Sequence, residues 1–187
     1  LRRLAVAGLV TLGFTAIQLA GTVKAFVMPE INYGQMVLEV ERAAADRARA
    51  IRVQHGGGGA HDPQDIADAL NRLPEPRALV SSPIHLDSLL QSGISGIRVD
   101  RILSATAPMS AQLARQLESR FGAHVNEVFG CTEAGSLASR ATASETLWQI
   151  AAPFDFEVLD NRVRISAEHL PEPVELHDVL ELVGGHH

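Results

Sequence analysis

The sequence predicts an α/β fold with a largely parallel sheet, helices on both faces and a β-rich C-terminal segment. Apolar runs of strand length alternate with amphipathic stretches of helical length along most of the 187 residues, a pattern typical of parallel strands joined by helices. Past Trp148 the apolar runs become shorter and more closely spaced, which indicates antiparallel hairpins. Apolar residues make up 46% and charged residues 20% of the chain, as in ordinary globular domains with a hydrophobic core.

The first elements come before a run of four glycines, residues 56–59. Residues 4–20 are mostly apolar, which is typical of a signal peptide or membrane anchor, but the run is short for a bilayer span. A buried strand followed by the start of a helix is the interpretation that we favour. Residues 23–28 are predicted to form a strand that ends at Pro29, and residues 35–50 an amphipathic helix.

The glycine run marks the clearest internal boundary, because glycine loses much backbone entropy in a helix or strand. We therefore divide the chain into residues 1–60 and residues 61–187. Capping residues then define the helices of the second segment, with Asp62 and Ser110 as N-caps and Pro63 at a first helical position. The predicted helices cover residues 63–73, 83–90 and 111–121, and the predicted strands cover residues 77–81, 99–105 and 125–129.

The end of the chain is predicted to be β-rich. After the strand that ends at Phe129, residues 130–136 (GCTEAGS) are predicted to be a loop. Two short strands, residues 156–160 and 163–167, are separated by a turn at Asp160 and Asn161, which predicts a hairpin. A last strand is predicted over residues 179–183.

Charge and cysteine content exclude several classes of protein. The formal net charge of −6 argues against a nucleic-acid-binding protein, which needs a basic surface. Cys131 is the single cysteine, so the chain has neither an internal disulfide nor a cysteine-based zinc site. A single cysteine suits a reducing cytoplasm. We expect a cytoplasmic protein that binds neither nucleic acid nor membrane.

Two short motifs stand at a suitable separation in the middle of the chain. Residues 104–110 (SATAPMS) open a predicted helix, and residues 129–133 (FGCTE) follow the next predicted strand. Together they resemble the adenylate-forming superfamily of acyl-CoA synthetases and related AMP-ligases. The resemblance covers residues 61–187, about two-thirds of the chain, and is greatest to the bacterial ligases of aryl-polyene and related fatty-acid-like pigment pathways. It implies an incomplete adenylation-type domain.

This resemblance implies activation of a carboxylic acid by ATP and Mg²⁺ as an acyl-adenylate. The acyl group would then pass to the thiol of coenzyme A or an acyl carrier protein. Thr132 would offer a hydroxyl to a phosphate oxygen, and Glu133 would be a ligand of Mg²⁺, which takes few carboxylates. Asp178 would hold the ribose, although His177 stands where the family usually has glycine. The residues near the adenine would be Ala105, Thr106, Ala107, Pro108, Phe129 and Gly130.

Two parts of that family have no counterpart among these 187 residues. They are the Ser/Thr/Gly-rich phosphate loop that ends in lysine, and the small C-terminal domain with the catalytic lysine. We therefore expect this chain alone to be a poor or inactive catalyst. For Thr132 and Glu133 the alternative interpretation is a solvated loop with a helix cap.

Residues 23–63 resemble a different family, the C-terminal region of the α chain of 2-oxoacid:ferredoxin oxidoreductases. The likeness is carried by MPEINYGQM and by HGGGGAHDP. A natural fusion, a joined or designed sequence, or a chance likeness would each explain two resemblances in one chain. Besides the ligase, we therefore keep two alternatives: a segment of such an oxidoreductase, and a non-catalytic α/β module that binds a nucleotide or a partner.

Overall fold

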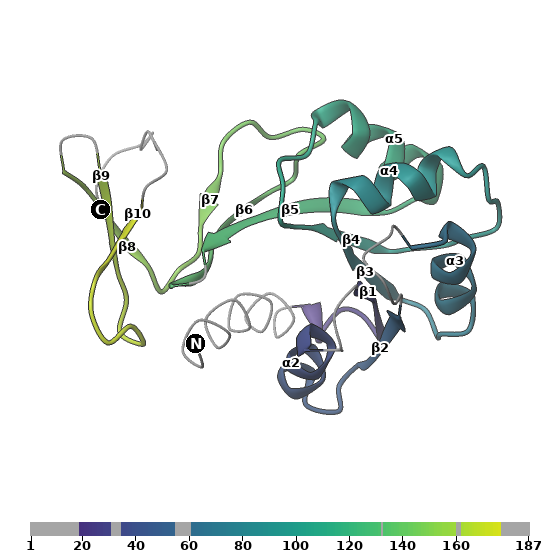
Figure 1. The fold of residues 1–187 in the computed structure, drawn as a ribbon, viewed down its shortest axis with the longest axis horizontal. Helices are drawn as coiled ribbons and strands as arrows, with labels where there is room; N and C mark the ends of the chain where they lie inside the picture. Colours follow the sequence, from purple (N-terminus) through teal and green to yellow (C-terminus); the bar gives the residue numbers. More distant parts are fainter. Residues whose placement is uncertain (1–18, 31–34, 55–60, 132, 160–161, 177–187) are drawn as a thin grey trace.

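A computed structural model describes residues 19–30, 35–54, 61–131, 133–159 and 162–176 (Figure 1). Its centre is a seven-stranded sheet with the spatial order β2-β1-β3-β4-β5-β6-β7, and a three-stranded sheet, β10-β9-β8, follows in the chain. The neighbours from β2 to β5 are paired in parallel, whereas β6 and β7 are antiparallel. This confirms the predicted α/β class with a largely parallel sheet and a β-rich C-terminal segment.

The elements have the following bounds. The large sheet contains β1 (Ala25–Glu30), β2 (Arg49–Gln54), β3 (Arg77–Ser81), β4 (Arg101–Ser104), β5 (His124–Cys131), β6 (Gly135–Arg140) and β7 (Gln149–Ile150). The helices are α2 (Gln35–Ala44), α3 (Pro63–Asn71), α4 (Pro83–Gln91) and α5 (Ala111–Phe121). The small antiparallel sheet contains β8 (Asp155–Leu159), β9 (Arg162–Ser166) and β10 (Val174–Leu176).

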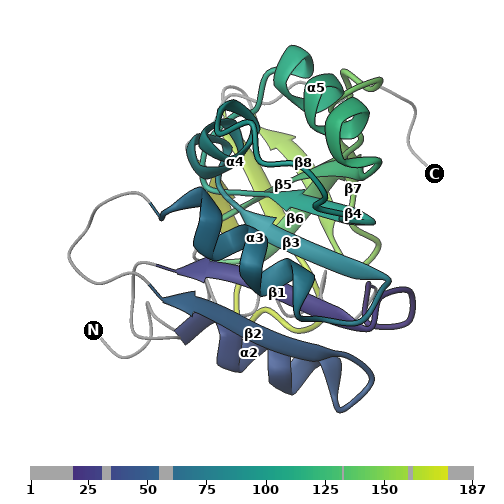
Figure 2. The same cartoon turned by 90° about the vertical axis from the view of Figure 1, so that its right-hand side faces the viewer.

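Helices cover both faces of the large sheet, as predicted, with α2 on one face and α3, α4 and α5 on the other (Figure 2). Strand β1 shows the division, because successive strand residues point to opposite faces. Phe26 and Met28 belong to the apolar cluster that includes α2, whereas Ala25 and Val27 belong to the cluster that includes α3, α4 and α5. The sheet therefore separates two cores.

The predicted N-caps are confirmed. Asp62 accepts a hydrogen bond from the backbone N–H of Gln64 at 2.9 Å, and Ser110 accepts one from Leu113 at 3.1 Å. Helix α5 ends at Phe121 and is capped by Gly122, whose φ of 69° is the left-handed conformation that glycine adopts without strain. Strand β3 has the predicted bounds, and β8 and β9 form the predicted hairpin.

The helix predicted over residues 35–50 is wrong from residue 45 onward. Helix α2 ends at Ala44, because Ala45 and Asp46 adopt left-handed backbone conformations with φ of 46° and 63°. The side chain of Arg47 then donates hydrogen bonds to carbonyls of the last helical turn. The residues that follow form β2, a strand that was not predicted.

The boundaries of β1 and β4 also differ from the prediction. Strand β1 does not end before Pro29 but continues to Glu30. Since β3 pairs only with Ala25–Val27, no neighbouring strand lies on the β3 side of Pro29, and a missing N–H is tolerated at such an open position. Strand β4 is shorter than predicted at both ends. One reason is that Asp100, just before it, uses its carboxylate to accept the N–H of Arg77 at 2.7 Å.

The segment 130–136, predicted to be a loop, is largely a hairpin. Strand β5 continues to Cys131 and β6 begins at Gly135, with Cys131 opposite Gly135 in the antiparallel pair. Strand β10 was also not predicted. The turn at Asp160 and Asn161 and the strand predicted over residues 179–183 lie outside the described residues.

The two predicted segments of the chain share one sheet. Strands β1 and β2 come from residues 1–60, and β1 pairs with β3 from residues 61–187. Residues 1–18 lie outside the described part, so the interpretation of the N-terminal apolar run stays a prediction. Among the helices that the structure describes, none combines the length and the apolarity needed to cross a bilayer.

Candidate functional site

The two motifs lie next to each other at one edge of the sheet. Strands β4 and β5 are parallel neighbours, with Ser104 opposite Glu127, and residues 105–108 follow the carboxyl end of β4. In open α/β sheets, ligands bind in the crevice outside the carboxyl ends of the strands. Residues 129–131 end β5 at that edge and Glu133 follows in the turn, so the fold brings the described parts of the two predicted nucleotide-binding segments to the same edge of the sheet.

The loop formed by residues 105–108 is anchored at both ends. The N–H of Ala105 donates to the carbonyl of Ser81 on β3 at 3.2 Å, and the N–H of Met109 donates to the Glu127 carboxylate at 2.8 Å. Between these anchors, Thr106 has a φ of 79°, a conformation that is strained for a β-branched residue. The exposed residues of the loop are Thr106, Ala107 and Pro108.

The β5–β6 hairpin admits no side chain at Gly130. A Cβ built there would collide with the backbone carbonyl of Gly135 and crowd the backbone of Ser136. The strand register also shifts between Phe129 and Gly130, as at a β-bulge. Gly130 is exposed, and Phe129 is half-buried beside it. The glycine of the motif is therefore required by the close approach of the two strands.

A cavity of about 480 Å³ lies beside the hairpin. Cys131 and Glu133 line one side of it, and residues 171–176 line the other. Glu133 is exposed, its side chain is a hydrogen-bond partner of the Cys131 thiol, and it makes no ion pair with any residue that the structure describes. A solvent-facing carboxylate at a cavity is suited to Mg²⁺, which keeps several waters and binds through one or two carboxylates together with phosphate oxygens.

The surroundings of Cys131 favour the protonated thiol. Burial raises its pKa above the ordinary value, an effect that hydrogen bonds with the backbone of Ala134 and Glu133 partly oppose. A raised pKa keeps the thiol protonated at neutral pH, and the thiolate is the nucleophilic form. This agrees with the sequence, in which nothing marks Cys131 as a nucleophile.

The small sheet packs against the β5–β6 hairpin. Ala134 and Leu137, from the turn and from β6, are buried in one apolar cluster with Val163, Ile165 and Leu176 of β9 and β10. Phe129 and Cys131 pack against the same cluster. The position of Glu133 therefore depends on the contact between the hairpin and the small sheet.

Two predicted site residues, Thr132 and Asp178, lie outside the described residues, so their roles stay predictions. Within the described part of the chain, no three side chains among His, Cys, Asp and Glu gather in a way that could hold a metal ion. Glu133 is therefore not part of a group of three metal-binding side chains in the described part of the chain.

Glu127 on β5 was not among the predicted site residues, and the structure buries it between Met109, at the end of the 105–108 loop, and Arg140 on β6. A signal was available, because an acidic residue at an inward position of a strand needs a partner. Its partner, Arg140, lies on β6, a strand that was not predicted.

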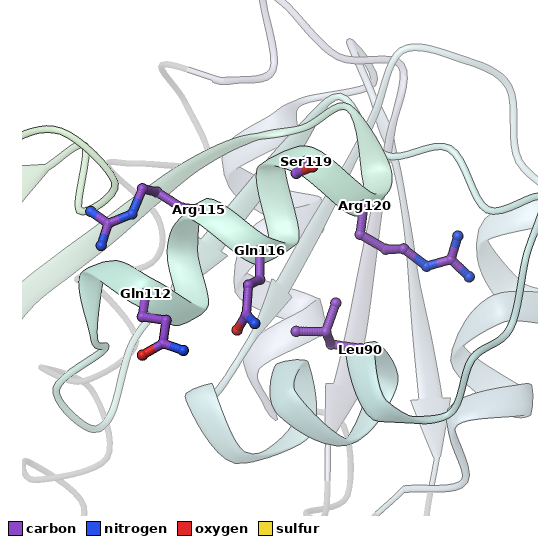
Figure 3. A pocket seen from close by; sticks show the side chains of 6 residues that line it. All are labelled: Leu90, Gln112, Arg115, Gln116, Ser119 and Arg120. Atoms are coloured by element: carbon purple, nitrogen blue, oxygen red, sulfur yellow. The ribbon is translucent and has the colours of Figure 1, made fainter.

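A second cavity, of about 520 Å³, lies between α4 and α5 (Figure 3). We call it the α4–α5 groove; it contains none of the predicted site residues. Its two guanidinium groups are engaged, since Arg115 donates to the carbonyl of Ala143 and Arg120 to those of Gly93 and Ile94. The residues that line it are Leu90, Gln112, Arg115, Gln116, Ser119 and Arg120.

The fold of this chain is similar to part of the fold of several solved proteins, among them MatB and an amide bond synthetase. Ligand-free MatB from Rhodopseudomonas palustris matches with a TM-score of 0.60 and 16% identity, over 88% of this chain and 36% of that chain. Amide bond synthetase McbA from Marinactinospora thermotolerans matches with a TM-score of 0.62 and 14% identity, over 84% and 37% of the two chains. MatB has also been solved with ATP bound, and that structure matches with a TM-score of 0.60 and 15% identity.

These similarities establish the fold. The chain spans little more than a third of the length of these structures. No protein-family model matches the sequence, and no curated protein matches it. A match over 88% of the chain includes part of the first sixty residues, because residues 61–187 are only about two-thirds of it. The comparisons give no support to the oxidoreductase resemblance of residues 23–63.

Proposed function

We propose that this chain is part of an ATP-dependent acyl-activating ligase, and that it contributes a nucleotide-binding surface at the carboxyl ends of β4 and β5. The observation that carries the proposal is the juxtaposition of the anchored 105–108 loop and the β5–β6 hairpin at that edge. The exposed carboxylate of Glu133 beside the cavity supports it, as does the fold shared with solved ligases.

The proposed reaction forms an acyl-adenylate. A carboxylate oxygen of the acid attacks the α-phosphorus of ATP, and the bond to pyrophosphate breaks. In a second step a thiol, of coenzyme A or of a carrier protein, attacks the acyl carbon and AMP leaves. The first step brings two anions together, so it depends on positioning and on charge neutralisation. A Mg²⁺ ion bound with the nucleotide would supply that neutralisation.

The residues of this chain would bind and orient the nucleotide. The exposed Glu133 carboxylate would ligate Mg²⁺, and the hydroxyl of Thr132 would donate to a phosphate oxygen. Phe129 and Gly130 would form one wall of the adenine site, and the small side chains of the 105–108 loop would allow close approach from the other. Asp178 would accept hydrogen bonds from the ribose. We expect these 187 residues to bind ATP with little turnover.

A second candidate is a non-catalytic nucleotide-binding module. The observation that favours it is the limited coverage of the solved structures, since the chain corresponds to only 36% of the length of MatB. Acid-dependent exchange of pyrophosphate into ATP distinguishes the two. Exchange by the chain, alone or in its full-length protein, supports the ligase, whereas ATP binding without exchange in both forms supports the module.

The role of Glu133 is tested by Glu133→Gln, which removes the charge and keeps the shape. We expect the Kd for ATP with Mg²⁺ to rise at least about tenfold, equivalent to about 1.4 kcal/mol, because the ion loses a charged ligand. Binding of ATP in the presence of EDTA should not change. Isothermal titration calorimetry measures both.

Glu172→Gln is the matched control, because Glu172 is an exposed carboxylate that lines the same cavity. It should leave the Kd for ATP with Mg²⁺ within about twofold. Equal Mg²⁺-dependent binding by Glu133→Gln and the wild type would count against the proposed site.

A further inference from the structure

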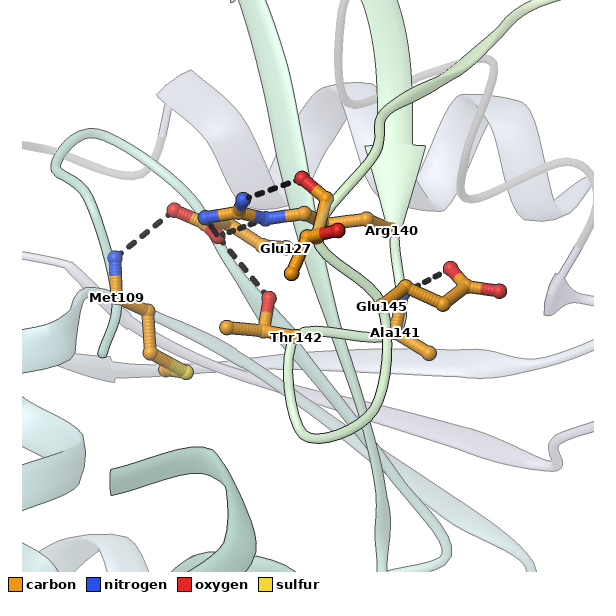
Figure 4. A network of polar contacts seen from close by, with 7 residues as sticks. Met109, Glu127, Arg140, Ala141, Thr142 and Glu145 are labelled. Carbon is orange, nitrogen blue, oxygen red and sulfur yellow. Dashed lines mark hydrogen bonds and ion pairs between the residues drawn. The ribbon is translucent and has the colours of Figure 1, made fainter. Parts of the chain in front are cut away.

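A buried carboxylate joins the 105–108 loop to the hairpin. Glu127 on β5 is only 3% exposed. Its Oε1 accepts the backbone N–H of Met109 at 2.8 Å. Its Oε2 accepts hydrogen bonds from Nε and Nη2 of Arg140 at 2.9 and 2.8 Å, and from the hydroxyl of Thr142 at 3.0 Å (Figure 4). One side chain thus contacts the end of the loop, strand β6 and the segment after it.

Fold stability alone is a weak reason for this arrangement. Burying an ion pair costs desolvation free energy that is comparable to the Coulombic gain. What the network supplies is fixed geometry, because Arg140 directs two charge-assisted donors to Oε2 while Oε1 holds the N–H of Met109, so the carboxylate is oriented from both oxygens. Here that geometry fixes the end of the 105–108 loop relative to β6.

The contacts continue from Arg140 to the proposed adenine wall. The guanidinium carbon of Arg140 lies 4.4 Å from the ring centroid of Trp148, a cation–π distance. The ring of Trp148 lies 5.7 Å from that of Phe129, tilted by 52°, a favourable separation for aromatic pairs. The Nη1 of Arg140 also donates to the carbonyl of Thr146 at 3.2 Å, which holds the segment before Trp148.

We infer that Glu127, Arg140 and Trp148 are positioning residues that set the width of the adenine site. The inference rests on the proposed function. Glu127 fixes the 105–108 loop on one side of the base, and Trp148, held by Arg140, supports the ring of Phe129 on the other. The spacing between these two walls determines how well a purine fits, and therefore how strongly ATP is preferred over GTP.

Three conservative variants test the network: Glu127→Gln, Arg140→Lys and Trp148→Phe. Each should raise the Kd for ATP at least fivefold and reduce the ATP-over-GTP preference by a similar factor. The control is Glu157→Gln, which breaks the exposed pair with Arg164 in the small sheet and should change neither quantity. Calorimetry on the 187-residue chain gives the Kd values, and circular dichroism melting identifies any variant that fails to fold.

A purely structural role would lower the melting temperature without altering the ATP-to-GTP ratio of the folded protein. Wild-type affinity and preference in folded Arg140→Lys and Trp148→Phe would therefore overturn the inference and leave the proposed function standing. Failure of the wild-type chain to bind ATP would contradict the proposed function, and the inference with it.

The network itself has a readout that needs no nucleotide. Hydrogen exchange of the Met109 amide should be slow in the wild type and at least tenfold faster in Glu127→Gln, because its acceptor is weakened. An unchanged exchange rate of the Met109 amide in a folded Glu127→Gln variant would show that Glu127 does not hold the loop. This result would overturn the inference whatever the outcome of the ATP-binding experiments.

Discussion

At the scale of single residues, the backbone at Gly130 leaves no room for a side chain. The carbonyl of Gly135 occupies the position that a Cβ would take, so the hairpin closes only with glycine there. Gly93 provides a contrast, because its φ of 70° is strained for other residues but no atom lies within 4 Å of an added Cβ. A comparison of Gly130 with Gly93 therefore distinguishes the effect of steric exclusion from the effect of backbone strain.

We expect Gly130→Ala to lower the free energy of unfolding by about 2–3 kcal/mol, because the strands must move apart to admit a methyl group. Gly93→Ala should cost about 1 kcal/mol, the usual penalty of a left-handed non-glycine residue. Urea denaturation of both variants measures the difference. Equal losses of unfolding free energy in the two variants would contradict the steric exclusion of a side chain at Gly130.

Several candidate site residues could be named from the sequence, because they lie in the two motifs that carry the resemblance to adenylate-forming enzymes. The 105–108 loop, Phe129 and Glu133 stay predictions as site residues, and the structure exposes parts of each near one edge. Glu127 and Arg140 could not be paired in this way. They are 13 residues apart, and only the antiparallel return of β6 brings them together.

At the scale of elements, the helices with clear capping residues were the most predictable. Ser110 and Gly122 define α5, and Asp62 begins α3, because a cap is a local interaction that one residue determines. Strands β2 and β6 were missed. In β2, arginine and glutamine stand among the apolar residues, and β6 is rich in small residues, so neither shows the apolar pattern of a strand.

Ser110, the N-cap of α5, lies just after the 105–108 loop. Loss of this cap should measurably lower the stability of the protein. We expect Ser110→Ala to lower the free energy of unfolding by about 1 kcal/mol, because the N–H of Leu113 loses its acceptor. Thermal or urea unfolding, followed by circular dichroism, gives the value.

Ser82→Ala is the matched control at the N-cap of α4. Ser82 makes no side-chain capping bond to the backbone, and its hydroxyl lies 3.1 Å from Nδ1 of His85. We expect a cost of no more than about half that of Ser110→Ala. A larger cost at Ser82 would contradict the assignment of the two caps.

At the scale of the whole molecule, the glycine run divided the sequence but does not divide the sheet. Strand β1 lies between β2 and β3, so residues on both sides of the run build one sheet. Such pairing over a long sequence separation leaves no local signal. The α/β class could be predicted because it depends only on the alternation of strands and helices.

The central claim is that ATP binds at the carboxyl ends of β4 and β5, and chemical-shift mapping by NMR tests it most directly. Titration of the isotope-labelled chain with ATP and Mg²⁺ should shift the backbone signals of the 105–108 loop, Phe129, Gly130 and Glu133 before any others. Signals from the α4–α5 groove should stay constant and serve as the internal control. Shifts confined to that groove, or an unchanged spectrum at millimolar ATP, would contradict the account.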